Sequence, residues 1–143
     1  MLRPMTPSDR ASVGYLIRQL GYDVTDDEAE ERIHDIRSRP DHLLLVADFG
    51  VTVGWVHAYE VLLLEEATAV EIGGLVVSDT ARRRGSGTLL MQGAERWSLE
   101  RGISHIRLRS NVKRKAAHRF YRAIGYREIK KSLIFTKELL GDG

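Results

Sequence analysis

One stretch near the middle of the chain limits its fold more than any other, because it joins an apolar run to a glycine turn and a helical pattern. Residues 70–77 read VEIGGLVV, which is typical of a buried strand, and residues 82–87 read RRRGSG. From Leu89 onward apolar side chains recur at helical spacing, until Gly102 ends the pattern. A glycine-rich turn between a strand and a helix gathers free backbone N–H groups at the positive end of the helix dipole. The stretch therefore predicts a site for a phosphate group.

Two familiar phosphate-binding motifs do not fit this turn. A P-loop needs Gly-Lys-Ser or Gly-Lys-Thr after its spacer residues, and the sequence has no such run. A dinucleotide-binding fingerprint needs a third glycine where Leu90 stands. A third pattern does fit, because Arg82, Gly85 and Gly87 match Arg/Gln-x-x-Gly-x-Gly/Ala. The alternative is a solvated surface turn.

The rest of the chain predicts a mixed order of helices and strands. Capping residues and apolar spacing predict four helices: Thr6 to Gly21, Thr25 to about Arg37, Leu89 to Gly102, and Lys115 to Ala123. Apolar or alternating runs predict five strands: His42–Asp48, Val53–Leu62, Val70–Val77, Ile103–Arg109 and Ser132–Lys137. The sequence contains no repeat, low-complexity segment or linker, so we expect one domain over residues 1–143.

Composition excludes several classes of function. The chain has no cysteine, which rules out disulfides, thiolate metal sites and a cysteine nucleophile. The net charge is only +2, and the arginines are not interleaved with aromatic residues, so we do not expect nucleic acid as a partner. No apolar run approaches the length of a membrane span, and the first residues lack the apolar core of a signal peptide. We therefore expect a cytoplasmic protein without a membrane partner.

A second motif follows the glycine turn. Ala117, Tyr121, Gly125 and Tyr126 match Ala-x-x-x-Tyr-x-x-x-Gly-Phe/Tyr on a predicted helix. Together with the turn motif and a short LRP strand before the first helix, this pattern resembles the GNAT superfamily of N-acetyltransferases, which use acetyl-CoA. The resemblance covers nearly the whole chain.

The resemblance implies an α/β (α+β) fold with a mixed, mostly antiparallel sheet that is splayed near its centre and flanked by helices. It implies direct transfer of acetyl from acetyl-CoA to a primary amine of a small molecule or a protein, with no metal. A homodimer is possible, and the acceptor is unknown. The alternative is a non-catalytic acyl-CoA-binding regulatory domain.

The resemblance also implies where the cofactor binds. The pantetheine arm would bond to strand backbone, the pyrophosphate would sit on the glycine turn, and further contacts would come from the second motif. The implied residues are Leu75, Val76, Val77, Arg82, Arg83, Arg84, Gly85, Ser86, Gly87, Thr88, Asn111, Arg114 and Tyr121. At Arg114 the chain departs from the asparagine that many members have, and arginine would instead reach the 3′-phosphate or a carbonyl of CoA.

Two residues are candidates for catalysis. The resemblance implies that the phenol of Tyr121 donates a proton to the departing thiolate, since a phenol is protonated at neutral pH. The alternative is a packing role, because Phe120 and Ile124 give the same helix an apolar face.

Glu71 is the second candidate, as an acid within an apolar strand. Acetyl transfer to an amine needs a general base, and burial would raise the pKa of this carboxyl unless an arginine compensates. The alternative is a strand-end glutamate that faces water or pairs with an arginine. His57, beside Trp55 and Tyr59 in the sequence, competes for the same role. Gly73 and Gly74 would leave room for substrate or mark a bulge.

Overall fold

The computed structural model describes residues 1–79, 81 and 85–141 of the chain. These residues divide into two compact units, residues 1–109 and residues 110–143, which are described separately. Three of the expected phosphate-binding residues, Arg82, Arg83 and Arg84, lie outside the described residues.

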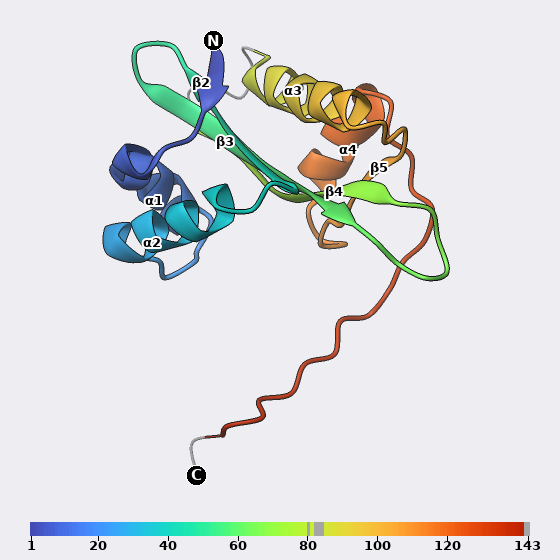
Figure 1. The fold of residues 1–143 in the computed structure, drawn as a ribbon. Coiled ribbons are helices and arrows are strands. Elements are labelled where there is room, and N and C mark those ends of the chain that lie inside the picture. Colours follow the sequence, from blue (N-terminus) through green and yellow to red (C-terminus); the bar gives the residue numbers. More distant parts are fainter. Residues whose placement is uncertain (80, 82–84, 142–143) are drawn as a thin grey trace. The chain divides into compact units, whose positions relative to one another are not determined.

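The first unit contains five strands and three α-helices (Figure 1). In chain order they are β1 (Leu2–Pro4), a 3-10 helix η1 (Pro7–Asp9), α1 (Arg10–Gln19), α2 (Asp26–Arg37), β2 (His42–Asp48), β3 (Thr52–Val61), β4 (Ala69–Val77), α3 (Ser86–Glu100) and β5 (Ile106–Leu108). The start of α2 shows why these bounds follow from sequence. The Thr25 hydroxyl accepts from the Glu28 N–H at 3.1 Å, and the Glu28 carboxylate accepts from the Thr25 N–H at 3.0 Å. This reciprocal cap satisfies two backbone donors that a helix start leaves unpaired.

The sheet has the order β1-β2-β3-β4-β5. Its first three pairings are antiparallel and the last, between β4 and β5, is parallel. This confirms the expected mixed, mostly antiparallel sheet. Pairing with β5 covers only Val70 to Ile72, so from Gly73 onward β4 has a strand neighbour on its β3 side alone among the described residues.

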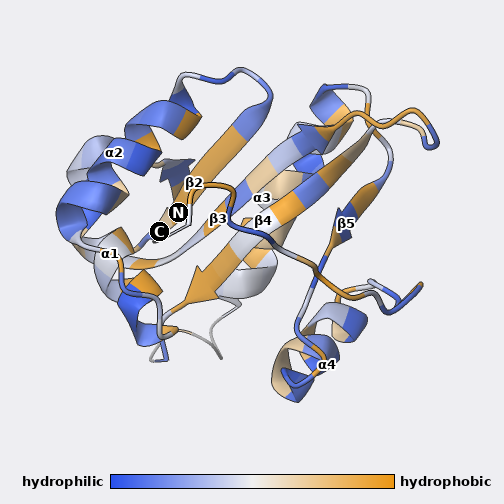
Figure 2. Cartoon of the chain, turned by 90° about the horizontal axis from the view of Figure 1, so that it is seen from below, coloured by the Kyte–Doolittle hydropathy of each residue, from blue (hydrophilic) through white to orange (hydrophobic). Residues whose placement is uncertain are grey.

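Helices cover both faces of this sheet. On one face Met5, Val13, Ile33 and Val46 form a buried cluster, which joins α1 and α2 to β2. On the other face α3 lies so close that a Cβ on its Gly93 would stand 2.8 Å from the side chain of Leu45. Neighbouring residues of β2 thus pack against helices on opposite faces of the sheet, because side chains alternate between the two faces along a strand. Figure 2 shows the apolar colouring along β2, β3 and β4 and the polar colouring along α2.

The second unit contains α4 (Lys115–Ala123) and a C-terminal segment without helix or strand. The strand predicted at Ser132–Lys137 is therefore wrong for the single chain. A strand forms only beside another strand, and no backbone hydrogen bond pairs residues 127–141 with other described residues. The strand predicted at Ile103–Arg109 is shortened to Ile106–Leu108 for a related reason, since β4 pairs with only those three residues.

No helix in the described part of the chain combines the length and the apolar character that crossing a bilayer demands.

Candidate functional site

A bulge interrupts β4 at its two glycines. The register shifts between His57 and Ala58, so Gly74 pairs with His57 while Ile72 pairs with Ala58. A Cβ on Gly73 would lie 2.7 Å from Nδ1 of His57, and one on Gly74 would lie 2.9 Å from the ring of Trp55. Of the two roles considered for these glycines, the structure supports the bulge, because neighbouring rings occupy the space that their missing side chains leave.

Beyond the bulge, β4 presents an open edge at Leu75 and Val76. Leu75 pairs with Val56 and Val76 pairs with Trp55, both on the β3 side. The β5 side of the same backbone has no strand partner in the described residues, because the parallel ladder ends at Ile72. An extended ligand that carries amide groups can add to such an edge by main-chain hydrogen bonds.

In the sequence, β4 is followed by the glycine turn and α3. Gly85 precedes the helix with a φ of 78°, in the left-handed region, and gives no side-chain cap. A Cβ there would meet no atom of the described residues within 4 Å, so the left-handed backbone conformation is what requires glycine. Ser86 and Gly87 are buried in the first turn, and Thr88 is half-buried. The first-turn N–H groups lie at the positive end of a 15-residue helix.

A network of polar side chains surrounds Glu71 on the next stretch of β4. Glu71 is buried, with 8% of its surface exposed. Its Oε2 accepts a hydrogen bond from the Tyr59 hydroxyl at 2.8 Å, and its Oε1 accepts from Nε of Arg107 at 2.9 Å. Nε of Arg109 lies 3.6 Å from Oε2, and Arg107 also binds Glu66 at 2.8 Å. The carboxylate therefore has partners on both oxygens.

This network decides the charge of Glu71. Burial acts to raise the pKa of the Glu71 carboxyl, but hydrogen bonds from Tyr59 and Arg107 and the charge of Arg109 outweigh it, and the pKa is lowered. The sequence predicts a raised pKa for Glu71 only where no arginine compensates for burial, and Arg107 is such an arginine. Glu71 is ionised at neutral pH, and its lowered pKa makes it a weaker proton acceptor.

His57 forms a second polar group, next to the bulge. Its Nε2 lies 2.9 Å from Nδ1 of His42, and the two rings stack with centroids 5.1 Å apart. The Tyr59 ring packs against both, with its centroid 5.5 Å from that of His57 and 5.3 Å from that of His42. Burial, with a smaller contribution from His42, lowers the pKa of His57 to about 4. His57 is therefore neutral at neutral pH.

The second unit contains Asn111 and Arg114 at the start of α4. The Oδ1 of Asn111 accepts from the Lys113 N–H at 2.9 Å, and its backbone carbonyl accepts from the Arg114 N–H at 3.0 Å. Asn111 thus forms the turn that opens α4, a local role that the motif comparison does not anticipate. Arg114 occupies the position just before the helix.

Tyr121 lies one turn after Ala117 on α4. Its ring is tilted against Phe120 at 5.3 Å and meets Tyr126 edge-on at 6.2 Å. Burial raises the pKa of the Tyr121 phenol, although the charge of Arg114 acts the other way. The phenol is therefore protonated at neutral pH, which is the state that a proton donor needs.

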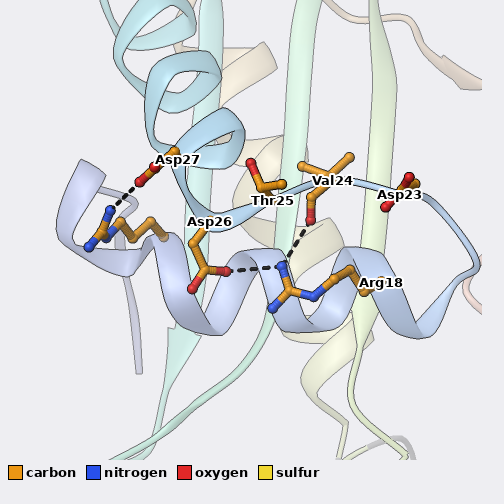
Figure 3. Close-up of a pocket in the computed structure, with 7 residues that line it drawn as sticks. Arg18, Asp23, Val24, Thr25, Asp26 and Asp27 are labelled. Atoms are coloured by element: carbon orange, nitrogen blue, oxygen red, sulfur yellow. Dashed lines mark hydrogen bonds and ion pairs between the residues drawn. The ribbon is translucent and has the colours of Figure 1, made fainter.

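Away from these groups, an open hollow of about 470 Å³ lies between α1 and the start of α2 (Figure 3). Arg18 donates to the Val24 carbonyl at 2.9 Å and to Asp26 at 3.0 Å, as the dashed lines show. Arg10 pairs with Asp27 at 2.7 Å. These bonds join α1 to the start of α2, which is a structural role.

Sequence reasoning misses several members of the polar networks, among them Arg107 and His42. A signal exists for Arg107, because residues 106–109 read IRLR and alternation places Arg107 and Arg109 on one face of a strand. Nothing in the sequence pairs His42 with His57, since that contact depends on the register of two strands. In the described part of the chain, no group of three His, Asp or Glu side chains is arranged to hold a metal ion.

Comparisons with known proteins agree with this geometry. Residues 13–126 match the model of the acetyltransferase (GNAT) family, which spans β4, the glycine turn and α4. No curated protein sequence matches the chain.

Solved structures match along almost the whole chain. The aminoglycoside N-acetyltransferase AAC(6')-Iy in complex with CoA superposes with a TM-score of 0.85 at 19% identity, over 96% of this chain and 93% of that one. A putative acetyltransferase from Agrobacterium tumefaciens superposes with a TM-score of 0.83 at 21% identity, over 96% of this chain and 99% of that one. The aminoglycoside 6'-N-acetyltransferase AAC(6')-Ih from Acinetobacter baumannii superposes with a TM-score of 0.81 at 18% identity, over 97% of this chain and 98% of that one. Identities this low show the fold alone.

Proposed function

Because the chain belongs to the GNAT acetyltransferase family, we propose that it transfers the acetyl group of acetyl-CoA directly to a primary amine. The amine belongs to a small molecule or to a protein, and residues 1–143 act as one N-acetyltransferase domain. The observation that carries this function is that Leu75 and Val76 of β4 lack a strand partner on their β5 side in the described residues, while the left-handed Gly85 opens α3 a few residues later in the sequence.

Each of these two features suits a different part of acetyl-CoA. The backbone of Leu75, Val76 and Val77 would bind the amides of the pantetheine arm as an added strand. The first-turn N–H groups from Ser86 to Thr88 would hold the pyrophosphate at the helix start, and Arg82, Arg83 and Arg84 would add positive charge. Asn111 and Arg114 would contact the cofactor from the second unit.

Tyr121 acts as the proton donor to the leaving thiolate. The amine nitrogen bonds to the thioester carbonyl carbon, the bond from that carbon to sulfur breaks, and Tyr121 gives its phenolic proton to the sulfur. The phenol later regains a proton from solvent. Its raised pKa supports this role, because it keeps the proton in place until sulfur needs it. The role requires the second unit to bring Tyr121 to the thioester.

Glu71 takes the ammonium proton from the acceptor, directly or through water. The support is its ionised state and its place beside the open edge of β4. The lowered pKa limits its strength as a base, so His57 remains the competitor. His57 is neutral, as a base must be, but its pKa of about 4 makes it weak as well.

Aminoglycosides are the first acceptor class to test, since structural neighbours of this chain act on them. A panel of aminoglycosides, polyamines, amino acids and peptide amines is incubated with acetyl-CoA, and release of free thiol is followed. The chain has no cysteine, so it contributes no thiol of its own. We expect thiol release with at least one amine. Binding of acetyl-CoA without release on any amine would instead support a regulatory acyl-CoA-binding domain.

A further inference from the structure

Two histidines and an aspartate form a chain of polar contacts from the bulge in β4 to the start of β2. Nε2 of His57 lies 2.9 Å from Nδ1 of His42, and Nε2 of His42 lies 3.9 Å from Oδ1 of Asp41. Both histidines are half-buried, whereas half of the Asp41 side chain is exposed. The remaining ring nitrogen of His57, Nδ1, lies on the side of the bulge, beside the exposed Gly73.

The order of these contacts decides which nitrogen of each ring carries the proton. A carboxylate only accepts hydrogen bonds, so Asp41 favours a proton on Nε2 of neutral His42. Nδ1 of that ring is then an acceptor, and its contact with His57 needs the proton on Nε2 of His57. Nδ1 of His57 keeps its lone pair, and no hydrogen bond within the described residues occupies it. The lone pair is therefore held on the side of the bulge, ready to accept a proton.

The other titratable and charged groups around the bulge bind one another. Tyr59 on β3 and Arg107 on β5 donate to the two oxygens of Glu71 on β4, and Arg109 lies 3.6 Å from the same carboxylate. Burial lowers the pKa of His57 to about 4, which keeps the imidazole neutral and makes it a weak base. Glu71 thus has partners on both oxygens, whereas His57 has a nitrogen without one in the described residues.

Acetyl transfer removes two protons from the acceptor nitrogen. The ammonium loses the first before the attack, and the proposed function gives that proton to Glu71. After the attack the nitrogen carries a positive charge and one proton more than the amide product has. This second proton is far more acidic than that of a free ammonium, because the nitrogen is giving its electron pair to the forming amide. A weak base therefore suffices to take it.

We propose that His57 accepts this second proton at Nδ1, and that His42 and Asp41 are positioning residues that hold its lone pair toward the bulge. This inference rests on the proposed acetyl transfer. The N–H bond of the adduct breaks and its electron pair stays on nitrogen, while the carbonyl re-forms as the bond from carbon to sulfur breaks. Sulfur receives the Tyr121 proton as before. The Asp41 carboxylate stabilises the imidazolium through His42, and the imidazolium returns its proton to water once the product leaves.

The first test reads the proton positions without any turnover. In protein labelled with ¹⁵N at its histidines, NMR at pH 8 should show a protonated Nε2 and an unprotonated Nδ1 for both His57 and His42. His57→Gln and His42→Phe each remove one set of signals, which assigns them. Asp41→Ala should mix the two tautomers of His42, because it removes the acceptor that favours one of them. A proton on Nδ1 of His57 in the unaltered protein overturns the proposal.

The second test compares two substitutions of His42 by steady-state kinetics on an amine that the enzyme accepts. His42→Gln keeps an oxygen that accepts from Nε2 of His57, whereas His42→Phe keeps only a ring that stacks on His57 and Tyr59. We expect kcat of His42→Phe to fall by about 10²-fold, the contribution of a positioned proton acceptor, and kcat of His42→Gln to fall much less. The Kd of acetyl-CoA should stay unchanged in both. His105→Phe is the matched control, since His105 is an exposed histidine.

The outcomes separate this inference from the proposed function. If the unaltered protein releases no thiol with any amine of the panel, the proposed function is wrong and the proton step falls with it. If it turns over and His42→Phe turns over equally fast, the role of His42 and His57 alone is wrong. Equal losses of kcat in His42→Phe and His42→Gln also overturn the inference, because position 42 would then act by packing and not through the proton of His57.

Discussion

At the scale of single residues, Glu71 combines two properties that usually exclude each other. It is buried, yet it stays charged because Tyr59 and Arg107 bond to its two oxygens. If this carboxylate is removed, Arg107 loses one of its hydrogen-bond acceptors. Leaving Arg107 without that acceptor costs more free energy than the bond itself contributes. Glu71 therefore stabilises the join between β3, β4 and β5, whatever part it takes in catalysis.

Glu71→Gln is expected to lower the free energy of unfolding at pH 7 by about 1–3 kcal/mol, the cost of a charged hydrogen bond left unmade. A carboxyl whose pKa is lowered in the folded state stabilises above its unfolded pKa, near 4.5, and loses this contribution as pH falls through the folded value. The difference between the variant and the unaltered protein should thus shrink below about pH 4.5. Urea unfolding at pH 7 and pH 3.5 measures it, with exposed Glu65→Gln as control. An equal loss at both pH values would contradict the charged network.

His57 also makes stability depend on pH, in this case because burial keeps the side chain neutral. Its pKa falls from 6.5 to about 4 on folding, so the unfolded chain binds the proton first as pH drops. Stability from neutral His57 is complete above pH 6.5 and is lost between pH 6.5 and about 4. His57→Gln keeps a hydrogen-bonding side chain but does not titrate. The melting temperature of the unaltered protein should therefore drop more between pH 7.5 and pH 5 than that of the variant, and equal drops would count against a buried neutral histidine.

Tyr121→Phe removes only the phenolic hydroxyl. If that hydroxyl protonates the leaving thiolate, kcat should fall by about 10²-fold or more, while the affinity for acetyl-CoA changes little. Tyr126→Phe is the matched control, because its ring meets Tyr121 edge-on in the same unit. Steady-state kinetics on an acceptor from the panel and calorimetric titration with CoA provide the two readings. Full turnover by the Tyr121 variant would leave this tyrosine a packing role.

At the scale of elements, the bounds of helices and strands were predicted correctly where local sequence signals define them, and incorrectly where they depend on pairing with a distant strand. Lys115–Ala123 and His42–Asp48 form as predicted, because helical spacing and an apolar run suffice to define them. Ile103–Arg109 shortens and Ser132–Lys137 forms no strand, because each depends on how far a neighbouring strand extends. The apolar run in residues 132–136 predicts that the segment can form a strand, but it does not identify the strand that would pair with it.

Gly85 tests the link between the glycine turn and α3. Gly85→Ala should lower the free energy of unfolding by about 1–2 kcal/mol, because a φ of 78° places the new Cβ in the left-handed region. The described residues add no crowding, since none of their atoms lies within 4 Å of that Cβ. Gly85→Asn should cost less, because asparagine tolerates this region better than alanine. Chemical denaturation of the three proteins ranks them, and an alanine variant as stable as the unaltered protein would show that the turn rearranges freely.

At the scale of the whole molecule, the sequence predicts local motifs better than it predicts the charge state of a buried side chain. The glycine turn and the Tyr121 motif are local patterns, so spacing alone reveals them. The charge state of Glu71 depends on Arg107, which lies 36 residues away and meets it only through the parallel pairing of β4 with β5. Burial, pairing and register together set the pKa, and none of the three is visible at a single position.

Acetyl-CoA should stabilise the molecule as a whole, because a ligand that binds only the folded state raises its stability with concentration. At 100 times its Kd the gain is about 2.7 kcal/mol, which for a chain of this length corresponds to a rise in Tm of roughly 5–10 °C. Gly87→Val should reduce that rise, since a branched side chain would block the phosphates at the start of α3, whereas Ser86→Ala should preserve it. Tyr121→Phe should preserve it as well, because its loss falls on turnover. Thermal unfolding over a series of acetyl-CoA concentrations measures all four proteins at one fixed protein concentration, so that any dimer contributes equally. A flat Tm up to millimolar acetyl-CoA, together with a flat calorimetric titration, would remove the cofactor site and with it the proposed reaction.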